Sequence, residues 1–477
     1  MKNYERIISK NDIENIHELS LRILDTVGIQ FEHPKALEIL KANGCRVDGQ
    51  KVFFDRSIVE ETIEKIPAAF DLCTQTGLTT VGGGSMLMEP VSGNIYINDG
   101  ETIRRTTNKD TVDLFKLADS SDIITSNYLN YFSDESSMTD DERLFYQTAM
   151  MLKYSNKATL EIYPFPLGLP HDYDFEAMYC RSFEFINSFY GNDIPHGIYL
   201  VNPLSPLCYD TDPLQKLMIM AKHGIPMMLA PCAMPMLTAP YSVYSMVAMT
   251  NAEVLAGAVL TQLIKPGHSM VFGNTSASTN LRTLQLAIGS PETALVSYAL
   301  AGLADLYQVP FRTAGGLSDA KGCDVQAGLE TMLMCMATLD IKPDYILHGC
   351  GTIGSFNVMS FDKFLMDEEA YRMAARFLKG IDTTEEKSCF ELLSEVGPRG
   401  NFLHGRTPKM FREEFFTPKL LNKEDPNQWQ NTGSKPLTDA LMEERIKRIA
   451  AYKPPKLSAE QERLVNQYIP NQYRETL

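Results

Sequence analysis

The sequence lacks the features that mark several classes of protein. Its nine cysteines are scattered and form no CxxC pair, which argues against a disulfide framework and against a structural zinc knuckle. No apolar signal core accompanies the first residues, MKNYERIISKND, and the best apolar run, 225–237, is short and interrupted by three prolines. We therefore expect a cytoplasmic protein with reduced thiols.

Basic residues are also scarce. Lys and Arg number 44 against 60 Asp and Glu, which gives a net charge of −16, and such a surface repels nucleic acids and anionic membranes. We expect neither as a partner. The remaining composition, 44% apolar and 22% charged over 477 residues, is typical of a globular protein with a large core.

The order of patterns along the chain predicts three parts. Residues 1–90 carry capped helical patterns and form a helical N-terminal extension. Residues 91–400 alternate short apolar runs with long helices. Residues 401–477 are rich in proline and charge and predict an extension packed on the central domain.

The central part predicts repeated βα units and hence a parallel sheet. Eight strands at this spacing favour a closed (β/α)8 TIM barrel, and a doubly wound open sheet is the alternative. The predicted strands are Ile95–Ile97, Ile123–Tyr128, Thr159–Tyr163, Ile198–Val201, Pro226–Leu229, Met270–Gly273, Pro310–Thr313 and Tyr345–His348.

Because the site of such a barrel lies at the carboxyl ends of its strands, the polar residues there are candidates. They are Asn130, Tyr163, Asn202, Cys232, Asn274, Arg312 and His348. This rim is rich in amides, and it shows no HxH, no HExxH and no dense acid pair. Metal-dependent hydrolysis is therefore disfavoured, and we expect no bound metal.

Two of these candidates are cationic or can become so. His348 ends an apolar run and precedes a glycine, so it is either a hydrogen-bonded strand end or a contact to an anion or a leaving group. Arg312 is either an ion-pair partner or a substrate clamp. The aromatic residues Tyr96, Tyr163 and Phe356 belong either to the core or to a cation cage.

The glycines of GCGTIG, residues 349–354, match the GxGxxG dinucleotide fingerprint. That fingerprint requires a helix directly after its last glycine, and residues 355–361 have no helical periodicity. A tight glycine turn is the simpler interpretation, and an NAD-dependent oxidoreductase remains an alternative.

Several long motifs resemble one family. They are VNPLSPL (201–207), MLAPCAMPMLTAPYS (228–242), NAEVLAGAVLTQLIKPG (251–267), AGGLSDAKGCDVQAGLE (314–330) and WQNTGSK (429–435). Together they resemble the trimethylamine methyltransferase superfamily over nearly the whole chain. The resemblance implies a (β/α)8 barrel that passes a methyl group from a methylated amine to the cobalt of a separate corrinoid protein.

Founding members of that family carry pyrrolysine, at a position that aligns with Gly322 of this chain. A glycine there resembles the branch of glycine betaine methyltransferases, whose relatives also use proline betaine, carnitine or butyrobetaine. The chemistry agrees, because a quaternary ammonium leaves as a neutral amine and needs no metal or acid. The resemblance thus implies that glycine betaine becomes dimethylglycine, and a betaine-binding protein without catalysis is a further alternative.

The chain lacks the DxHxxG signature of corrinoid proteins, so the corrinoid must arrive on a partner. A carboxylate beside the ammonium would stabilise the substrate more than the transition state, whereas aromatic faces hold a cation gently. We therefore expect Tyr96, Tyr163 and Phe356 to form a cage. Of the other candidates, His348 and Arg312 would bind the betaine carboxylate, Asn202 and Asn274 would add hydrogen bonds, and a homo-oligomer is left open.

Overall fold

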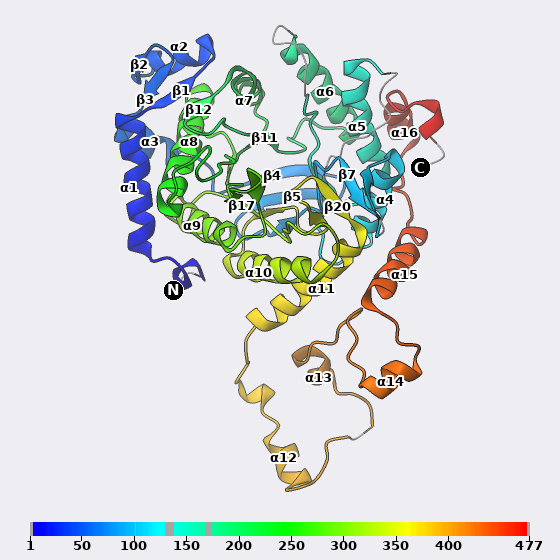
Figure 1. Cartoon of the computed structure of the whole chain (residues 1–477). Helices are drawn as coiled ribbons and strands as arrows, with labels where there is room; N and C mark the ends of the chain where they lie inside the picture. The colour runs from blue at the N-terminus through cyan, green and yellow to red at the C-terminus, as the bar shows by residue number, and fades with distance from the viewer. Residues whose placement is uncertain (1–2, 101, 129–137, 167–172, 404, 475–477) are drawn as a thin grey trace.

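The computed structural model describes residues 3–100, 102–128, 138–166, 173–403 and 405–474. Its centre is a curled sheet of six parallel strands in the order β11–β13–β14–β17–β18–β6 (Figure 1). These strands are β6 (Leu87–Met88), β11 (Tyr199–Val201), β13 (Met227–Leu229), β14 (Met270–Gly273), β17 (Phe311–Ala314) and β18 (Tyr345–Leu347).

A second parallel pair, β9 (Ser126–Tyr128) and β10 (Ala158–Glu161), lies between the two edges of that sheet. The Thr125 backbone N–H donates to the Met88 carbonyl at 2.9 Å, beside β6, and the Ile198 N–H donates to the Leu160 carbonyl at 2.6 Å, beside β11. Backbone hydrogen bonds therefore join this pair to both edges of the six-stranded sheet.

The first predicted strand, Ile95–Ile97, is wrong as a member of the central sheet. Those residues overlap β7 (Tyr96–Asn98), which pairs in a small four-stranded sheet with β8 (Ile103–Arg105) and β20 (Val358–Ser360), the last joined by β19 (Thr352–Ile353). The place next to β18 belongs to β6, whose two residues are too few to show a period. Each of the other predicted strands overlaps a strand of the central sheet or of the β9–β10 pair.

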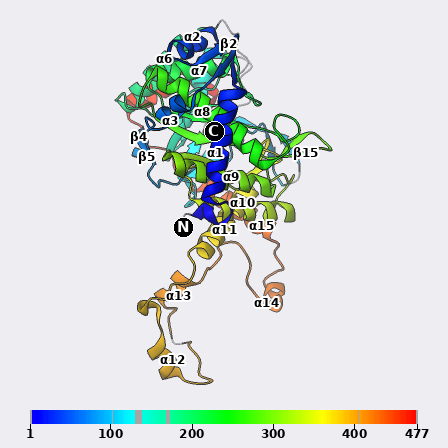
Figure 2. The ribbon, with the colours of Figure 1, turned by 90° about the vertical axis from the view of Figure 1, so that its left-hand side faces the viewer.

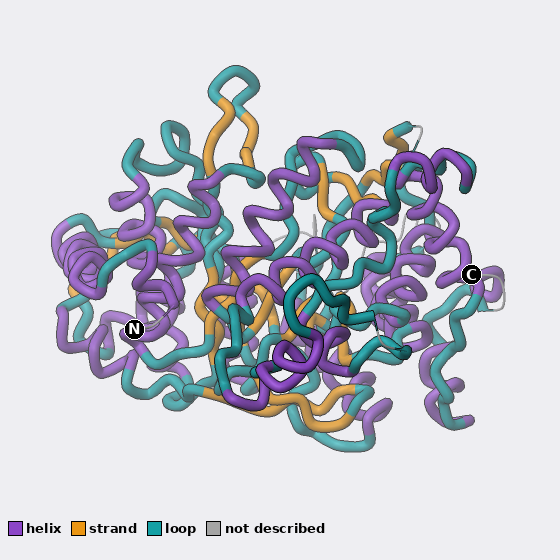
Figure 3. The backbone as a smooth tube through the Cα atoms, turned by 90° about the horizontal axis from the view of Figure 1, so that it is seen from below, coloured by secondary structure: helices purple, strands orange, loops and turns teal. Residues whose placement is uncertain are grey.

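Helices surround the strands, as the view from below shows in purple around orange (Figure 3). They are α4 (Asn108–Asp119), α5 (Asp140–Tyr154), α6 (Phe175–Tyr190), α7 (Thr211–His223), α8 (Val243–Ile264), α9 (Pro291–Tyr307), α10 (Val325–Ile341) and α11 (Phe361–Leu378). Among the described residues, α8 alone is long and apolar enough to cross a membrane, but 89% of its apolar window is buried inside the protein. A core helix has this property.

The N-terminal part covers one side of the sheet. Its longest helix packs along α8, where the Ser20 hydroxyl donates to the Ala248 carbonyl at 2.9 Å. The elements are η1 (Asn3–Arg6), α1 (Lys10–Thr26), α2 (Pro34–Ala42), α3 (Arg56–Ile63) and the strands β1 (Ile29–Phe31), β2 (Arg46–Asp48) and β3 (Lys51–Phe53). These three strands form a small sheet with β12 (Cys208–Tyr209) of the central part.

Two hairpins mark opposite ends of the central strands. The hairpin of β4 (Ala69–Thr74) and β5 (Gly77–Gly82) places Leu72 and Val81 in the same apolar cluster as the strand residues Val271 and Tyr345. The hairpin of β15 (Ser278–Asn280) and β16 (Gln285–Ala287) follows the carboxyl end of β14 and lies on the other side of the molecule (Figure 2).

The C-terminal part both packs on the body and leaves it. Helix α15 (Leu437–Ala450) contacts α4 and α11, and α16 (Ala459–Asn466) contacts α5 and α6. The segment between α11 and α15 extends away from the body (Figure 1). It contains η2 (Glu385–Lys387), α12 (Phe390–Val396), α13 (Lys409–Glu414) and α14 (Pro426–Asn431), and η3 (Asn471–Tyr473) follows α16.

Candidate active site

Arg312 lies inside the curled sheet, on β17, and is 2% exposed. Its Nε atom lies 3.1 Å from the Met228 sulfur, and its Nη1 atom has no hydrogen-bond partner. Burial lowers the pKa of Arg312, and the nearby Glu161 carboxylate opposes that shift. A buried guanidinium with an unpaired donor is costly, so this group is poised for an anionic partner.

Glycine at position 273, on the neighbouring strand β14, makes room for that side chain. A Cβ added to Gly273 would lie 3.2 Å from Arg312 Nε and 2.9 Å from the Ala230 Cβ. Gly273 and Arg312 are partners in the strand register. The close approach of Ala230 and of the arginine therefore favours glycine at this position.

Two carboxylic acids share the interior with Arg312. Glu89 follows β6 and is fully buried, and neither of its carboxyl oxygens has a hydrogen-bond partner. Glu161 ends β10 and accepts a hydrogen bond from the Tyr345 hydroxyl at 3.5 Å. The expectation of a rim without an acid pair is therefore wrong.

Their environment favours the protonated forms of these acids. Burial, and then the charge of Glu161, raise the pKa of Glu89 well above its usual value. Burial raises the pKa of Glu161 to about 7, against the lowering influence of Tyr128, Arg312 and Tyr345. Removing water penalises a carboxylate more than a carboxylic acid, so the interior holds less negative charge than two ordinary glutamates would.

A register shift explains why Glu161 lies in the interior. Leu160 belongs to the interior apolar cluster, and in a regular strand the next residue would face the other way. The pairing of β10 with β9 shifts register between Thr159 and Glu161. Such an irregularity redirects a side chain, and here it brings Glu161 to Tyr345.

His348 directly follows β18 and contacts a second candidate. Its ring lies 4.7 Å from the Phe356 ring, at an interplanar angle of 46°, and its Nδ1 lies 3.2 Å from the Ser92 hydroxyl. Burial, and then the charge of Arg312, lower the pKa of His348 to about 3. The imidazole is therefore neutral at physiological pH and acts as a hydrogen-bonding group rather than as a cation.

The backbone around this pair is unusual. His348, Ser355 and Phe356 have φ angles of 52°, 56° and 71°. These values lie in the left-handed region, which residues other than glycine and asparagine seldom occupy. Asp319 stabilises the loop, because its carboxylate accepts from the Ser355 hydroxyl at 2.6 Å and from the Gly289 N–H at 2.9 Å. The loops after β14, β17 and β18 are thereby tied together.

The glycine motif next to His348 is not a dinucleotide fingerprint. The segment after Gly354 leads into strand β20, and the helix α11 starts only at Phe361. Gly349 instead packs against the end of β6: its N–H donates to the Glu89 carbonyl at 2.7 Å, and an added Cβ would lie 2.5 Å from Met88 Cγ. Close approach of two strands explains this glycine.

The remaining candidates lie in different surroundings. Tyr96 is linked to the Phe356 loop through its N–H, which donates to the Asn357 carbonyl at 3.1 Å, and Arg105 lies 5.9 Å from its ring centroid. Tyr163 packs on Phe183 of α6, and its hydroxyl accepts from the His196 N–H at 3.1 Å. The structure therefore brings Tyr96 near Phe356 through the backbone and directs Tyr163 toward α6.

The last candidates are amides and small residues. Asn202 is exposed, and the Asn274 side chain donates to the Thr250 hydroxyl at 2.9 Å. Cys232 follows β13 and lies close enough to Arg312 for their charges to interact. Gly322 is in the loop after β17, where an added Cβ would meet only the Asn98 side-chain nitrogen, 3.7 Å away. Asn130 lies outside the described residues.

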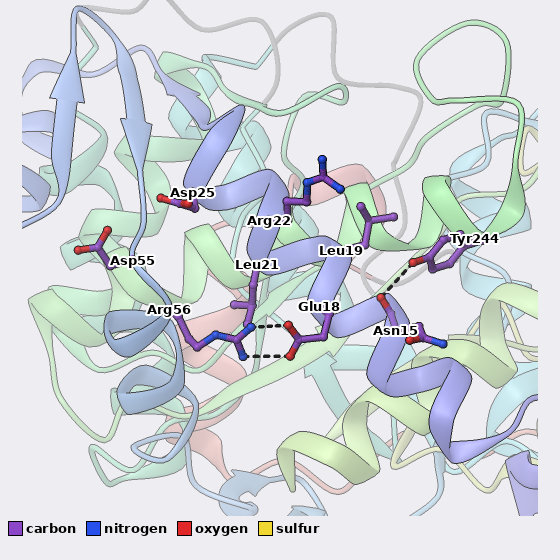
Figure 4. A pocket seen from close by; sticks show the side chains of 9 residues that line it. All are labelled: Asn15, Glu18, Leu19, Leu21, Arg22, Asp25, Asp55, Arg56 and Tyr244. Carbon is purple, nitrogen blue, oxygen red and sulfur yellow. Dashed lines mark hydrogen bonds and ion pairs between the residues drawn. The ribbon is translucent and has the colours of Figure 1, made fainter.

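A surface hollow of about 590 Å³ between α1, α3 and α8 offers no comparable chemistry (Figure 4). Glu18 is already paired, because Arg56 donates to both of its carboxylate oxygens, and the other charged residues of the hollow, Arg22, Asp25 and Asp55, lie at its open surface. The Tyr244 hydroxyl donates to the Asn15 carbonyl at 3.1 Å. In the part of the chain that the structure describes, no group of three His, Cys, Asp or Glu residues is arranged to hold a metal ion.

Sequence comparison supports one family. The family model for trimethylamine methyltransferase (MTTB) matches residues 2–476. Two proteins of Eubacterium limosum, a proline betaine:corrinoid methyltransferase and an L-carnitine:corrinoid methyltransferase, are each 32% identical, over 98% of this chain and 98% and 97% of their own. A glycine betaine methyltransferase of Desulfitobacterium hafniense (strain Y51) is 33% identical over 89% of this chain and 88% of its own.

The fold comparison agrees in architecture. The crystal structure of the Methanosarcina barkeri monomethylamine methyltransferase superposes with a TM-score of 0.51 and 10% identity, over 96% of this chain and 92% of that one. This similarity shows a shared mixed α/β fold. Because the family model covers almost every residue, the chain belongs to the trimethylamine methyltransferase (MTTB) family.

Proposed function

We propose that this protein transfers a methyl group from a quaternary amine, glycine betaine, to the cobalt of a corrinoid on a separate protein. The C–N bond breaks, its electron pair stays on nitrogen, and the methyl carbon bonds to cobalt. The products are dimethylglycine and the methylated corrinoid, and no proton needs to move. The relatives named for glycine betaine, proline betaine and carnitine support this reaction class.

The observation that carries the proposal is the buried, incompletely paired guanidinium of Arg312. A betaine carries a carboxylate at one end, and an arginine fork is the side chain best suited to bind it in a site from which water is excluded. In the proposal the carboxylate accepts a hydrogen bond from Nη1.

The neutral His348 and the Phe356 ring complete the recognition. A neutral imidazole donates one hydrogen bond without adding charge, and its contact with Ser92 at 3.2 Å fixes the ring. The aromatic face of Phe356 attracts the trimethylammonium group by roughly 0.5–2 kcal/mol. Tyr96 is the second aromatic residue of the proposed cage, because its backbone N–H donates to the Asn357 carbonyl in the same loop.

The two interior acids fit the reaction because they are held toward the protonated form. A fully charged carboxylate beside the ammonium would stabilise the bound substrate more than the transition state, in which the nitrogen charge fades. The raised pKa values of Glu89 and Glu161 reduce that effect. With both acids protonated, Arg312 gives the pocket a net positive charge, which favours the carboxylate of the substrate.

Further residues have proposed roles at the site. Tyr163, Asn202 and Asn274 are the remaining proposed substrate contacts, although the hydroxyl of Tyr163 and the amide of Asn274 already have protein partners. Gly322 is the proposed counterpart of the family's pyrrolysine, and its lack of a side chain supports a substrate other than trimethylamine.

The corrinoid belongs to the partner protein in this proposal, which also assigns the enzyme to the cytoplasm. We infer that the eight strands close a (β/α)8 ring, because hydrogen bonds at Thr125 and Ile198 join the β9–β10 pair to both edges of the six-stranded sheet. The proposed parts remain 1–90, 91–400 and 401–477, with β6 as the one strand that the first part supplies to the sheet.

The proposal is tested by mixing the protein with a reduced Co(I) corrinoid protein and following methylation of the corrinoid by its visible spectrum. The substrates to compare are glycine betaine, proline betaine, L-carnitine, γ-butyrobetaine and trimethylamine. The proposal expects turnover with glycine betaine and none with trimethylamine. Turnover only with another betaine would replace the named substrate, and tight betaine binding without methylation would favour a binding protein.

A further inference from the structure

A long segment of the chain leaves the body without a packing partner. Residues 380–418, here called the arm, extend from the end of α11 well beyond the other helices (Figures 1 and 2). None of the described arm residues is buried. Ordering this many residues costs conformational entropy that buried apolar surface normally offsets, so the arm requires a surface that the single chain does not provide.

The arm is rich in large apolar side chains that face solvent. Phe390 is 71% exposed and Leu403 is 92% exposed. The complete set of exposed large apolar residues in the arm is Ile381, Phe390, Leu392, Leu393, Phe402, Leu403, Phe411 and Phe415. This many exposed large apolar residues in one segment favours an interaction surface.

The base of the arm is fixed to the body at both ends. The Arg376 side chain on α11 donates to the Glu414 carbonyl at 2.6 Å, and the Lys419 N–H donates to the Glu369 carboxylate at 3.1 Å. Lys387 and Glu414 form an ion pair at 3.0 Å within the arm. The arm is therefore a long loop with both ends anchored on α11, unlike a frayed terminus.

A matching apolar surface lies on the neighbouring helix α10. Val325, Leu329 and Leu333, spaced four residues apart on one face, are 79%, 71% and 40% exposed. Exposed aliphatic residues at this spacing form a stripe suited to another apolar segment. Helix α10 packs closely on α11, from which the arm departs, so the stripe and the arm belong to the same side of the body.

We propose that the arm of each chain docks on the α10 stripe of a second copy of this chain, so that two copies exchange arms about a two-fold axis. An isologous contact requires both halves of the interface on one subunit, and the arm and the stripe supply them. The arm alone spans more than the roughly 20–30 residues per side of a standard interface.

The charge of the arm and its direction favour a second copy over the corrinoid protein. The arm holds seven acidic and five basic residues and thus little of the net charge of −16, so two acidic chains can meet there with limited repulsion. In Figure 2 the β4–β5 hairpin and β15 lie on opposite sides of the body, and the arm extends below the body, toward neither of them. It therefore does not extend over the carboxyl end of the strands, which a corrinoid must approach.

Sedimentation velocity of the full chain at micromolar concentration is the first test, and a dimer is expected. The triple variant Phe390→Ser, Leu393→Ser, Leu403→Ser should weaken dimerisation by about 100-fold or more, since apolar anchors dominate interface affinity. Leu329→Arg on the stripe should do the same. Leu78→Ser is the matched control, because Leu78 is 68% exposed but lies on the β4–β5 hairpin, and it should leave the dimer intact.

Photo-crosslinking identifies the docking surface. Benzoylphenylalanine in place of Phe390, in a mixture of isotope-labelled and unlabelled chains, should give crosslinks between differently labelled chains that map to α10. Circular dichroism checks that each variant is folded. A monomeric wild type, an unchanged dimer in the triple variant, crosslinks only within one chain, or crosslinks that form only with the corrinoid protein would each overturn the proposal.

Discussion

The rings of His348 and Phe356 lie 4.7 Å apart at the carboxyl end of β18. Both residues hold left-handed backbone conformations, and the charge of the buried Arg312 contributes to keeping the imidazole neutral. One loop thus presents a hydrogen-bonding ring and an aromatic face next to a buried cation. A zwitterion with a carboxylate and an alkylammonium group matches these three elements.

Replacing His348 tests its share of this recognition. His348→Ala should lower the affinity for glycine betaine about tenfold, because one hydrogen bond to a charged group contributes roughly 1.5–3 kcal/mol and water recovers part of it. Isothermal titration calorimetry gives the affinity. His223→Ala, at the outer end of α7 beside Glu176, is the control; equal affinities for both variants and the wild type would refute the assignment.

The neutral state of His348 also makes a prediction about acid stability. Its pKa of about 3 in the folded protein lies below the usual value near 6.5, so the unfolded chain binds the proton first as pH falls. The stability contributed by this neutral group is complete above about pH 6.5 and is lost as pH falls toward 3. In His348→Gln the unfolding free energy, measured with urea between pH 6.5 and 4, should therefore depend less steeply on pH than in the wild type. An unchanged slope would contradict the prediction.

Glu161 should titrate in the range where the enzyme works. With a pKa of about 7, its carboxyl ionises as pH rises through neutrality. Ionisation should tighten betaine binding and lower kcat, since the carboxylate favours the bound cation over the transition state. Steady-state kinetics from pH 6 to 8 should show KM and kcat both falling as pH rises. In Glu161→Gln neither KM nor kcat should change over this range.

The raised pKa of Glu161 also predicts how the stability of Glu161→Gln, relative to wild type, changes with pH. The folded-state pKa of Glu161 is raised, so its stabilising contribution is present below about pH 4.5 and is lost as pH rises through about 7. Glu161→Gln should therefore become more stable relative to wild type by up to about 1.4 kcal/mol for each pH unit in that range. Glu176→Gln on the outer surface of α6 is the control, and it should show no such gain.

The sequence predicts the parts of the site that follow simple rules. Arg312 and His348 are candidates because polar residues near strand ends mark the site of a parallel sheet; the structure places Arg312 within β17 and His348 directly after β18, and their binding roles stay predictions. Glu161 is missed because it continues an apolar strand, and only the register shift after Thr159, which depends on the partner strand, turns it inward. Glu89 is missed because β6 is two residues long and has no period to detect.

The orientation of a candidate also depends on contacts between distant segments. Tyr163 lies near the carboxyl end of a strand, as predicted, yet its hydroxyl meets the backbone N–H of His196, 33 residues away. The aromatic character of Phe356 is visible in the sequence, but its contact with His348 depends on two left-handed residues in its loop. Strand periodicity alone does not determine either arrangement.

Asp319 should act as a positioning residue for the same loop. Asp319→Ala removes the acceptor for Ser355 and for the backbone N–H groups of Ile288 and Gly289, so the Phe356 loop should become more mobile. We expect KM for betaine to rise at least fivefold while the thermal unfolding temperature falls by only a few degrees. Asp71→Ala, which removes a hydrogen bond to Thr80 on the β4–β5 hairpin, should leave KM unchanged; equal KM values in both variants would remove the positioning role.

Gly273 tests the packing around Arg312 independently of catalysis. In Gly273→Ala the new methyl group would lie 2.9 Å from the Ala230 Cβ, so these two groups must move apart, and 3.2 Å from Arg312 Nε, which must give by a few tenths of an ångström. We expect a loss of about 1–3 kcal/mol in unfolding free energy. Gly328→Ala in α10 is the matched substitution, because nothing lies within 4 Å of its new Cβ, and it should stabilise the helix by up to about 1 kcal/mol. Urea unfolding separates the two, and betaine affinity should fall only in Gly273→Ala. A stable Gly273→Ala variant with unchanged affinity would show that the guanidinium position is unimportant and would remove the anchor on which the proposed recognition of betaine depends.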